Sequence, residues 1–209
     1  MASRTTLSVP SEYIATLEEV LRQDLSREAL VRREGQRFCQ RVAGAVTELS
    51  HGLTRGRDQV VGSDYLHDRA RLEAYQVYYT TTNLLKIWPP LRELARSGFF
   101  AGHSSLNMLD IGTGLGAAVW GVASYLGAEC PGVGQLRVRA TDAYTDGLRP
   151  IETFATAFVR RSAPLTMSVE TSTLDLAAAA HEVTGGPYDL ITLMNVMNEV
   201  PEHHDEEIL

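Results

Sequence analysis

The chain has 209 residues, of which 44% are hydrophobic and 22% charged, and its net charge is −7. This composition is typical of a globular protein, and the lack of an apolar run of 18 residues excludes a transmembrane helix. The N-terminal residues lack the apolar core of a signal peptide, so we expect a cytoplasmic protein with no membrane partner. Residues 1–105 have a net charge of +2 and residues 106–209 one of −9. Neither half is basic enough for a dedicated nucleic-acid binder.

Residues 1–100 are predicted to form a helical N-terminal region that acts as a lid, selects the substrate or contacts a partner. Apolar residues recur there at helical spacing in four segments. The first predicted helix begins at Ser11, and the second runs from Ser26 to about Leu53. The third begins at Asp64 or Asp68 and reaches Leu85, and the fourth runs from Leu91 to Arg96. Pro89 and Pro90 are expected to break the third helix, and Gly98 to end the fourth.

From residue 106 onward, strands alternate with helices, which predicts a parallel sheet with right-handed crossovers. Strands are expected over 106–111, 135–141, 165–169 and 188–193, and helices over 117–126, 146–161 and 177–180. We therefore expect residues 101–209 to form an α/β domain with a Rossmann-like sheet. Four strands are fewer than a doubly wound sheet usually has. The chain is thus expected to be a truncated fragment, or to have its sheet completed by a partner chain or a missing C-terminal segment.

A glycine-rich turn follows the first predicted strand. After Asp110 the chain reads Ile-Gly-Thr-Gly-Leu-Gly, which places glycines at positions 112, 114 and 116 and a threonine at 113. Glycine adopts positive φ without steric cost and lets a ligand approach the backbone closely. A carboxylate at Asp110 would repel a pyrophosphate but attract a cation. The turn therefore predicts a nucleotide-type site with a preference for a cationic ligand.

Polar residues also follow the other three predicted strands: Asp142, Asp175 and Asn195. Because ligands of open α/β sheets bind outside the carboxyl ends of the strands, we expect these side chains to share one site with Asp110. Asp142 can accept hydrogen bonds from two ribose hydroxyls, and Asp175 from an adenine amine. Asp110 can attract the ammonium of an amino acid group, directly or through water, and favours a sulfonium electrostatically. Together these residues describe a pocket for S-adenosylmethionine (SAM).

The same residues carry a family resemblance. The segment Asp110-Ile-Gly-Thr-Gly-Leu-Gly resembles the first motif of class I SAM-dependent methyltransferases, and later segments resemble the other three motifs: Thr141-Asp142-Ala143, Leu174-Asp175-Leu176 and Asp189-Leu-Ile-Thr-Leu-Met-Asn-Val. The match covers residues 106–201 and implies SN2 transfer of the SAM methyl group to an acceptor. The cofactor-binding residues that it implies are Asp110, Gly112, Thr113, Gly114, Gly116, Asp142, Ala143, Asp175, Leu176 and Asn195.

A nicotinamide-binding Rossmann domain is the main alternative, because Gly112-Thr-Gly-Leu-Gly-Ala117 also fits the pattern G-x-G-x-x-G/A. Three features weaken it. Asp110 would face a pyrophosphate, about a hundred helical residues come first, and Asp142 lies further on than the acid expected about 20 residues after the glycines. A related fold that no longer binds a ligand is the remaining alternative.

A narrower resemblance involves the residues before the first motif. Tyr65-Leu66, the segment 74–86, the segment 91–94 and Asn195-Val-Met-Asn-Glu-Val are similar to a methyltransferase-like family associated with the small ribosomal subunit. It implies an rRNA or ribosomal acceptor and the small ribosomal subunit as a partner. Many members carry a later cysteine cluster for an iron–sulfur centre, and this chain ends before any such cluster. A small-molecule methyltransferase and a non-catalytic assembly or scaffold protein are the alternatives.

The catalytic group is not identified by any signature, since the sequence has no Asn-Pro-Pro-Tyr motif and no well-placed cysteine. The candidates are Asn198, Glu199 and Tyr79. A helix-start cap explains the first two equally well, and a buried aromatic face explains Tyr79. His203 and His204 lie among acids, but successive helical residues point apart, so no metal site is expected there.

Overall fold

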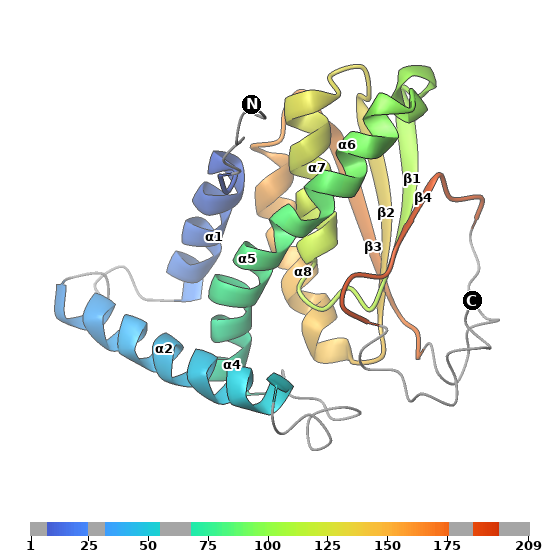
Figure 1. Cartoon of the computed structure of the whole chain (residues 1–209). Helices are drawn as coiled ribbons and strands as arrows, with labels where there is room; N and C mark the ends of the chain where they lie inside the picture. Colours follow the sequence, from blue (N-terminus) through green and yellow to red (C-terminus); the bar gives the residue numbers. More distant parts are fainter. Residues whose placement is uncertain (1–7, 25–31, 55–67, 176–185, 197–209) are drawn as a thin grey trace, which may run out of the picture.

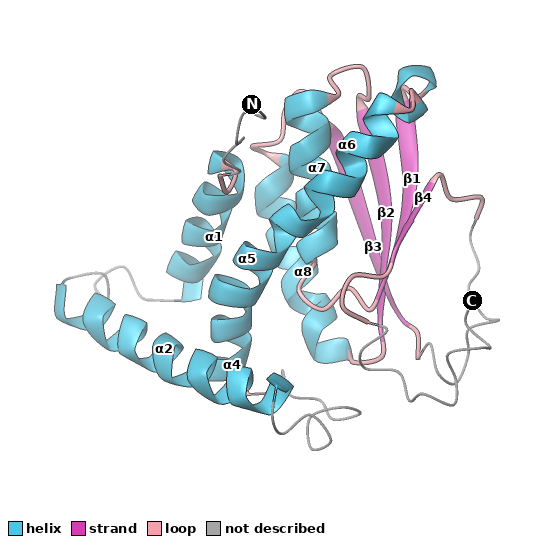
Figure 2. Cartoon of the chain, in the orientation of Figure 1, coloured by secondary structure: helices cyan, strands magenta, loops and turns pink. Residues whose placement is uncertain are grey.

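The computed structural model describes residues 8–24, 32–54, 68–175 and 186–196, which form an α/β fold (Figures 1 and 2). Four strands form one parallel sheet: β1 (Ser105–Ile111), β2 (Gln135–Asp142), β3 (Thr166–Thr173) and β4 (Leu190–Thr192). The described α-helices are α1 (Ser11–Asp24), α2 (Arg32–Thr54), α4 (Arg69–Ala74), α5 (Thr81–Asn83), α6 (Trp88–Arg96), α7 (Ala117–Glu129) and α8 (Thr145–Val159). A π-helical turn, η1 (Tyr75–Thr80), and two 3₁₀ turns, η2 (Leu84–Ile87) and η3 (Phe99–Gly102), join some of them. The predicted α/β class and parallel sheet are confirmed.

The strands lie in the order β3-β2-β1-β4. The chain moves outward from β1 to β2 and β3, and it then crosses to the other side of β1 to form β4. The direction of winding therefore reverses between β1 and β4, with Asp110 paired directly with Thr192. Ligands of open α/β sheets bind at the carboxyl ends of the strands beside such a reversal.

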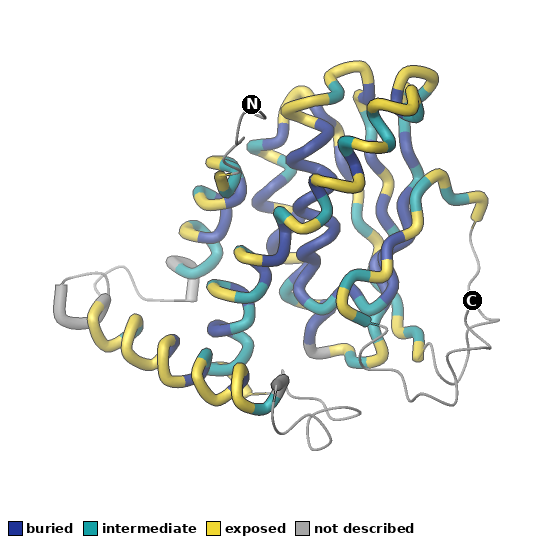
Figure 3. Tube along the Cα trace, viewed as in Figure 1, coloured by how far each residue is buried: buried dark blue, intermediate teal, exposed yellow. Residues whose placement is uncertain are grey.

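The main hydrophobic core lies between one face of the sheet and the helices that cover it, with α7 at its centre. Every α7 residue from Ala117 to Leu126 is buried (Figure 3). This matches its sequence, because a helix that is apolar on all sides is stable only when it is enclosed. Trp120 packs on Phe154 of α8, with 4.6 Å between ring centroids. The helix that follows the predicted glycine turn is thus fixed by the core.

The N-terminal helices pack onto this core at two places. Tyr13 of α1 contacts Phe154 with 5.2 Å between ring centroids, and Glu19 pairs with Arg160 and Arg161 after α8. A small separate cluster joins α2 to α4; its buried members are Val42, Ala45, Leu49 and Ala74. Figure 3 shows that much of the remaining surface of α2 is exposed.

The third and fourth predicted helices differ from the observed ones. Asp68 caps α4, as one of the two predicted starts, and its carboxylate accepts a hydrogen bond from the Arg71 N–H at 3.0 Å. The helix then continues as a π turn, a short α turn and a 3₁₀ turn, which the sequence did not predict. Pro89 and Pro90 lie in the first turn of α6. The third predicted helix therefore ends at Ile87, just before the expected break, and the fourth begins at Trp88 rather than Leu91, because a helix tolerates proline in its first turn.

Gly98 ends α6 with φ of 83°, as predicted. The strand predicted over 165–169 extends to Thr173, whereas the one predicted over 188–193 is shorter. The helix predicted over 177–180 lies outside the described residues. Cys39 and Cys130 are both free thiols.

Candidate cofactor site

The turn after β1 contains three glycines in the left-handed region. The φ angles of Gly112, Gly114 and Gly116 are 63°, 53° and 80°. Residues with a Cβ adopt this conformation at a cost of roughly 1–2 kcal/mol each. At Gly116 a Cβ would also lie 2.7 Å from Nε1 of Trp120, which donates to the Leu115 carbonyl at 2.8 Å. Glycine is therefore required here by both conformation and packing.

Asp110 lies buried beside this glycine loop (residues 112–116), and the residue is 1% exposed. One carboxylate oxygen accepts a hydrogen bond from the Thr113 hydroxyl at 2.7 Å, and the other accepts one from the Thr192 hydroxyl at 2.6 Å. Burial raises the pKa of Asp110 to about 6; the two hydroxyls oppose this, and the charge of Asp142 adds to it. Asp110 therefore ties the loop to the end of β4, and its predicted attraction for a ligand cation stays a prediction.

Asp142, the last residue of β2, also binds the glycine loop. One carboxylate oxygen accepts from the Gly114 N–H at 2.8 Å and the other from the Tyr144 N–H at 3.1 Å. The Thr113 N–H donates to the Thr141 carbonyl at 2.9 Å, so a backbone hydrogen bond also joins the loop to the end of β2. The predicted meeting of Asp110, the glycine loop and Asp142 is confirmed.

Two side chains from distant segments cover the glycine loop. A Cβ on Gly112 would lie 2.1 Å from a methyl carbon of Val196, and one on Gly114 would lie 3.6 Å from the Tyr75 hydroxyl oxygen. Asn195 adopts a left-handed φ of 68°, which asparagine tolerates better than most residues. Asn195 lies in the turn after β4, and the next residue, Val196, contacts the glycine loop.

The other predicted site residues are placed as follows. Ala143 and Asp175 are exposed directly after β2 and shortly after β3, and Asn195 is exposed after β4. Leu176, Asn198 and Glu199 lie outside the described residues. The ligand roles predicted for all of these residues stay predictions.

Tyr79 belongs to η1 and contacts its neighbours in that region. Its ring stacks on Tyr75 with 5.3 Å between centroids and meets Tyr78 edge-on at 5.2 Å. Burial raises the pKa of Tyr79, while a hydrogen bond with Ser50 of α2 opposes the rise. The tyrosine that contacts the glycine loop is Tyr75, which the sequence did not single out from its neighbours.

Thr192 and Val196 were also missed as members of the site. Thr192 can be recognised as a partner of Asp110 only when β4 is known to lie beside β1. Once β4 is placed beside β1, the hydroxyl of Thr192 at the end of β4 is the signal that could have suggested this partner.

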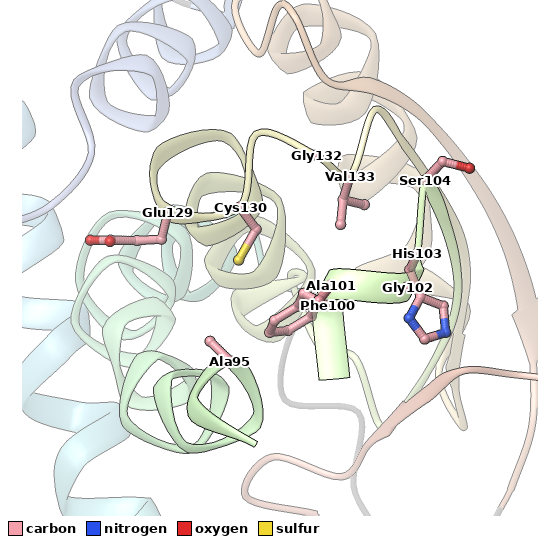
Figure 4. Close-up of a pocket in the computed structure, with 10 residues that line it drawn as sticks. All are labelled: Ala95, Phe100, Ala101, Gly102, His103, Ser104, Glu129, Cys130, Gly132 and Val133. Carbon is pink, nitrogen blue, oxygen red and sulfur yellow. The ribbon is translucent and has the colours of Figure 1, made fainter. Parts of the chain in front are cut away.

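A separate cavity of about 520 Å³ lies at the opposite edge of the sheet (Figure 4). Its lining precedes β1 and β2 and therefore marks the amino ends of the strands; it includes Phe100, His103, Glu129, Cys130 and Val133. Nδ1 of His103 lies 2.7 Å from the Phe99 carbonyl oxygen. Within the described ranges, no three potential metal ligands cluster here or elsewhere.

Comparison of the chain with models of known protein families gave no match, and comparison with curated proteins gave none either. In the described part of the chain, no helix combines the length and the apolar character needed to cross a membrane.

Proposed function

We propose that this chain is a SAM-dependent methyltransferase. The observation that carries the proposal is the position of the glycine loop: it follows β1 beside the reversal of strand order, and two carboxylates hold it. The four motif resemblances along residues 106–201 support the same cofactor.

The charges favour a sulfonium over a pyrophosphate. Above pH 6 Asp110 is mainly ionised, and Asp142 lies close enough to influence its pKa. A dinucleotide would bring two phosphate charges to this pair of carboxylates, whereas SAM would bring a cation. The nicotinamide alternative is therefore the weaker one, although the start of α7 could by itself accept an anion.

The residues present fit the parts of this cofactor. The backbone of the glycine loop would hold its amino acid end, the carboxylate of Asp142 at the end of β2 would accept the ribose hydroxyls, and Asp175 would accept the adenine amine. SAM supplies an electrophilic methyl group, which a nucleophile takes as the bond from carbon to sulfur breaks and a thioether leaves. The contribution of the chain is to orient the two reactants and to exclude water.

Titration calorimetry with SAM, S-adenosylhomocysteine (SAH) and NAD⁺ tests the proposal. We expect the first two to bind and NAD⁺ not to bind. Asp142→Asn should weaken SAM binding about tenfold or more, because it removes charged acceptors. Glu129→Gln, at the opposite edge of the sheet, is the matched control and should bind normally. Binding of NAD⁺ without SAM would overturn the proposal.

The class of acceptor needs a separate measurement. The narrower resemblance makes rRNA or a ribosomal component the first acceptor to test, and a small molecule the second. A gel shift with small-subunit rRNA at two salt concentrations should show weaker binding at high salt, since phosphate contacts release counterions. A chain that binds SAM but shifts no RNA at either concentration would favour a small-molecule acceptor.

A further inference from the structure

We propose that the π-helical turn η1 forms a wall of the cofactor site beside the glycine loop. In this arrangement Tyr75 contacts the cofactor, and Tyr13 of α1 holds Tyr75 in place. The inference rests on the proposed function, because the ligand is taken to be an S-adenosyl group. It adds a cofactor-contacting residue from the N-terminal helices to a site built otherwise from the sheet.

Tyr75 contacts the glycine loop. A Cβ on Gly114 would lie 3.6, 3.7 and 4.0 Å from the hydroxyl oxygen, Cε1 and Cζ of Tyr75. These are ordinary contact distances, so the hydroxyl edge of the ring lies over the backbone of the middle glycine. The Gly114 N–H binds Asp142, so the ring edge, the loop and this carboxylate are contiguous. Tyr75 is only partly buried.

The helix at Tyr75 departs from α geometry where it meets the site. In η1 the hydrogen bonds span five residues, which adds one residue to the turn and rotates the following residues by about 100°. Such turns are frequent at functional sites. Two threonine hydroxyls support the wider turn: Thr80 donates to the Tyr75 carbonyl at 3.3 Å, and Thr81 to the Gln76 carbonyl at 3.4 Å.

Tyr13 connects this turn to the core. Its hydroxyl donates to the Gln76 carbonyl at 3.4 Å and lies 3.3 Å from the Thr81 hydroxyl. Burial raises the pKa of Tyr13 above its ordinary value, so the hydroxyl keeps its proton. The Tyr13 ring packs on Phe154, which in turn packs on Trp120 below Gly116. One chain of contacts thus links η1 with the glycine loop through α1, α8 and α7.

The other end of the same column of helices, from α4 through α5 to α6, is fixed on α7 (Figure 1). A Cβ on Gly121 would lie 2.3 Å from the Leu84 carbonyl oxygen, and Trp88 Nε1 donates to the Gly121 carbonyl at 3.1 Å. With both ends anchored, Tyr75 has a defined position over the loop. This is the property that a binding wall needs, because preorganisation lowers the entropic cost of binding.

The test is calorimetry of SAM and SAH with variants of the full chain. Tyr75→Ala should weaken binding of both ligands roughly tenfold, as the loss of an aromatic contact predicts. Tyr75→Phe should stay within about threefold of wild type, because it keeps the ring. Tyr78→Ala is the matched control: this tyrosine lies in the same turn, is 48% exposed and should bind normally. Tyr13→Phe should weaken binding about threefold with an unchanged circular dichroism spectrum.

Hydrogen exchange of the wild-type chain gives an answer even if Tyr75→Ala fails to fold. We expect SAM to slow amide exchange in residues 75–83. If the wild type binds SAM, but exchange there is unchanged or Tyr75→Ala binds normally, the wall is overturned and the proposed function stands. If the wild type binds neither SAM nor SAH, the proposed function and the wall are both overturned.

Discussion

Replacing Asp110 with asparagine should change how the stability of the fold depends on pH. The substitution keeps the size of the side chain and one carbonyl oxygen, and it removes the ionisable group that is buried beside the glycine loop. In wild type this group has a folded-state pKa of about 6, against an ordinary value of 3.8. The folded chain therefore holds the proton more tightly than the unfolded chain between these two values, and wild type loses stability as pH rises through this window.

The size of the effect follows from the two pKa values. They differ by about 2, and one pKa unit corresponds to about 1.4 kcal/mol, so ionisation of Asp110 costs the folded state about 3 kcal/mol above pH 6. Below pH 3.8 the carboxyl is protonated in both states and the cost disappears. Lost or altered hydrogen bonds in Asp110→Asn shift its stability by a similar amount at every pH. The difference in the free energy of unfolding between the variant and wild type should thus change by about 3 kcal/mol in favour of the variant between pH 3.5 and 7.

Urea unfolding of both proteins at several pH values measures this difference. Glu129→Gln, which removes an exposed acid from α7, controls for the loss of one negative charge. The reasoning is refuted if the free energies of unfolding of Asp110→Asn and wild type differ by an amount that stays constant within about 0.5 kcal/mol across this pH window. Asp110 would then not titrate as a buried acid in the folded chain.

Two further stability measurements probe the packing of α7 and the link between β1 and β4. Gly121→Ala should destabilise the fold by about 1–3 kcal/mol, because its Cβ would meet the Leu84 carbonyl oxygen at 2.3 Å. Gly127→Ala in the same helix meets no atom within 4 Å and should stabilise it by about 0.5–1 kcal/mol, so equal thermal shifts would contradict this account. Thr192→Val should cost about 1–3 kcal/mol in urea unfolding, and more above pH 6 than below it, since the hydroxyl lowers the pKa of Asp110. A loss that is larger at low pH would show that the hydroxyl does not serve the ionised carboxylate.

Much of the sheet could be predicted because its signals are local. An apolar strand, the glycine loop and a buried helix follow one another in this order within residues 105–129, and each has its own spacing of apolar or glycine residues. The meeting of Asp110 with Asp142 followed from a general rule, that parallel strands bring their carboxyl ends to one edge. No knowledge of side-chain contacts was needed for that step.

The partners of these residues could not be predicted, because they depend on choices that local patterns leave open. Thr192 reaches Asp110 only because β4 lies beside β1, and a fourth strand could equally continue beyond β3. Tyr75, Tyr78 and Tyr79 are the same residue type in one helical segment, so the sequence does not indicate which of them faces the loop. The π turn decides which of them contacts the loop, and one of its contacts is a hydrogen bond from Tyr13, which is more than sixty residues away.

The extra residue in η1 makes the length of this segment as important as its composition. Without that residue the helix would return to α geometry, and everything beyond it would turn by about 100° relative to Tyr75. Either the tyrosine would leave the glycine loop, or Leu84 and Trp88 would leave Gly121. Side chains between these two anchors can therefore be exchanged more readily than residues can be deleted or inserted, and a homologue that has lost one residue here would have to seat its N-terminal helices differently.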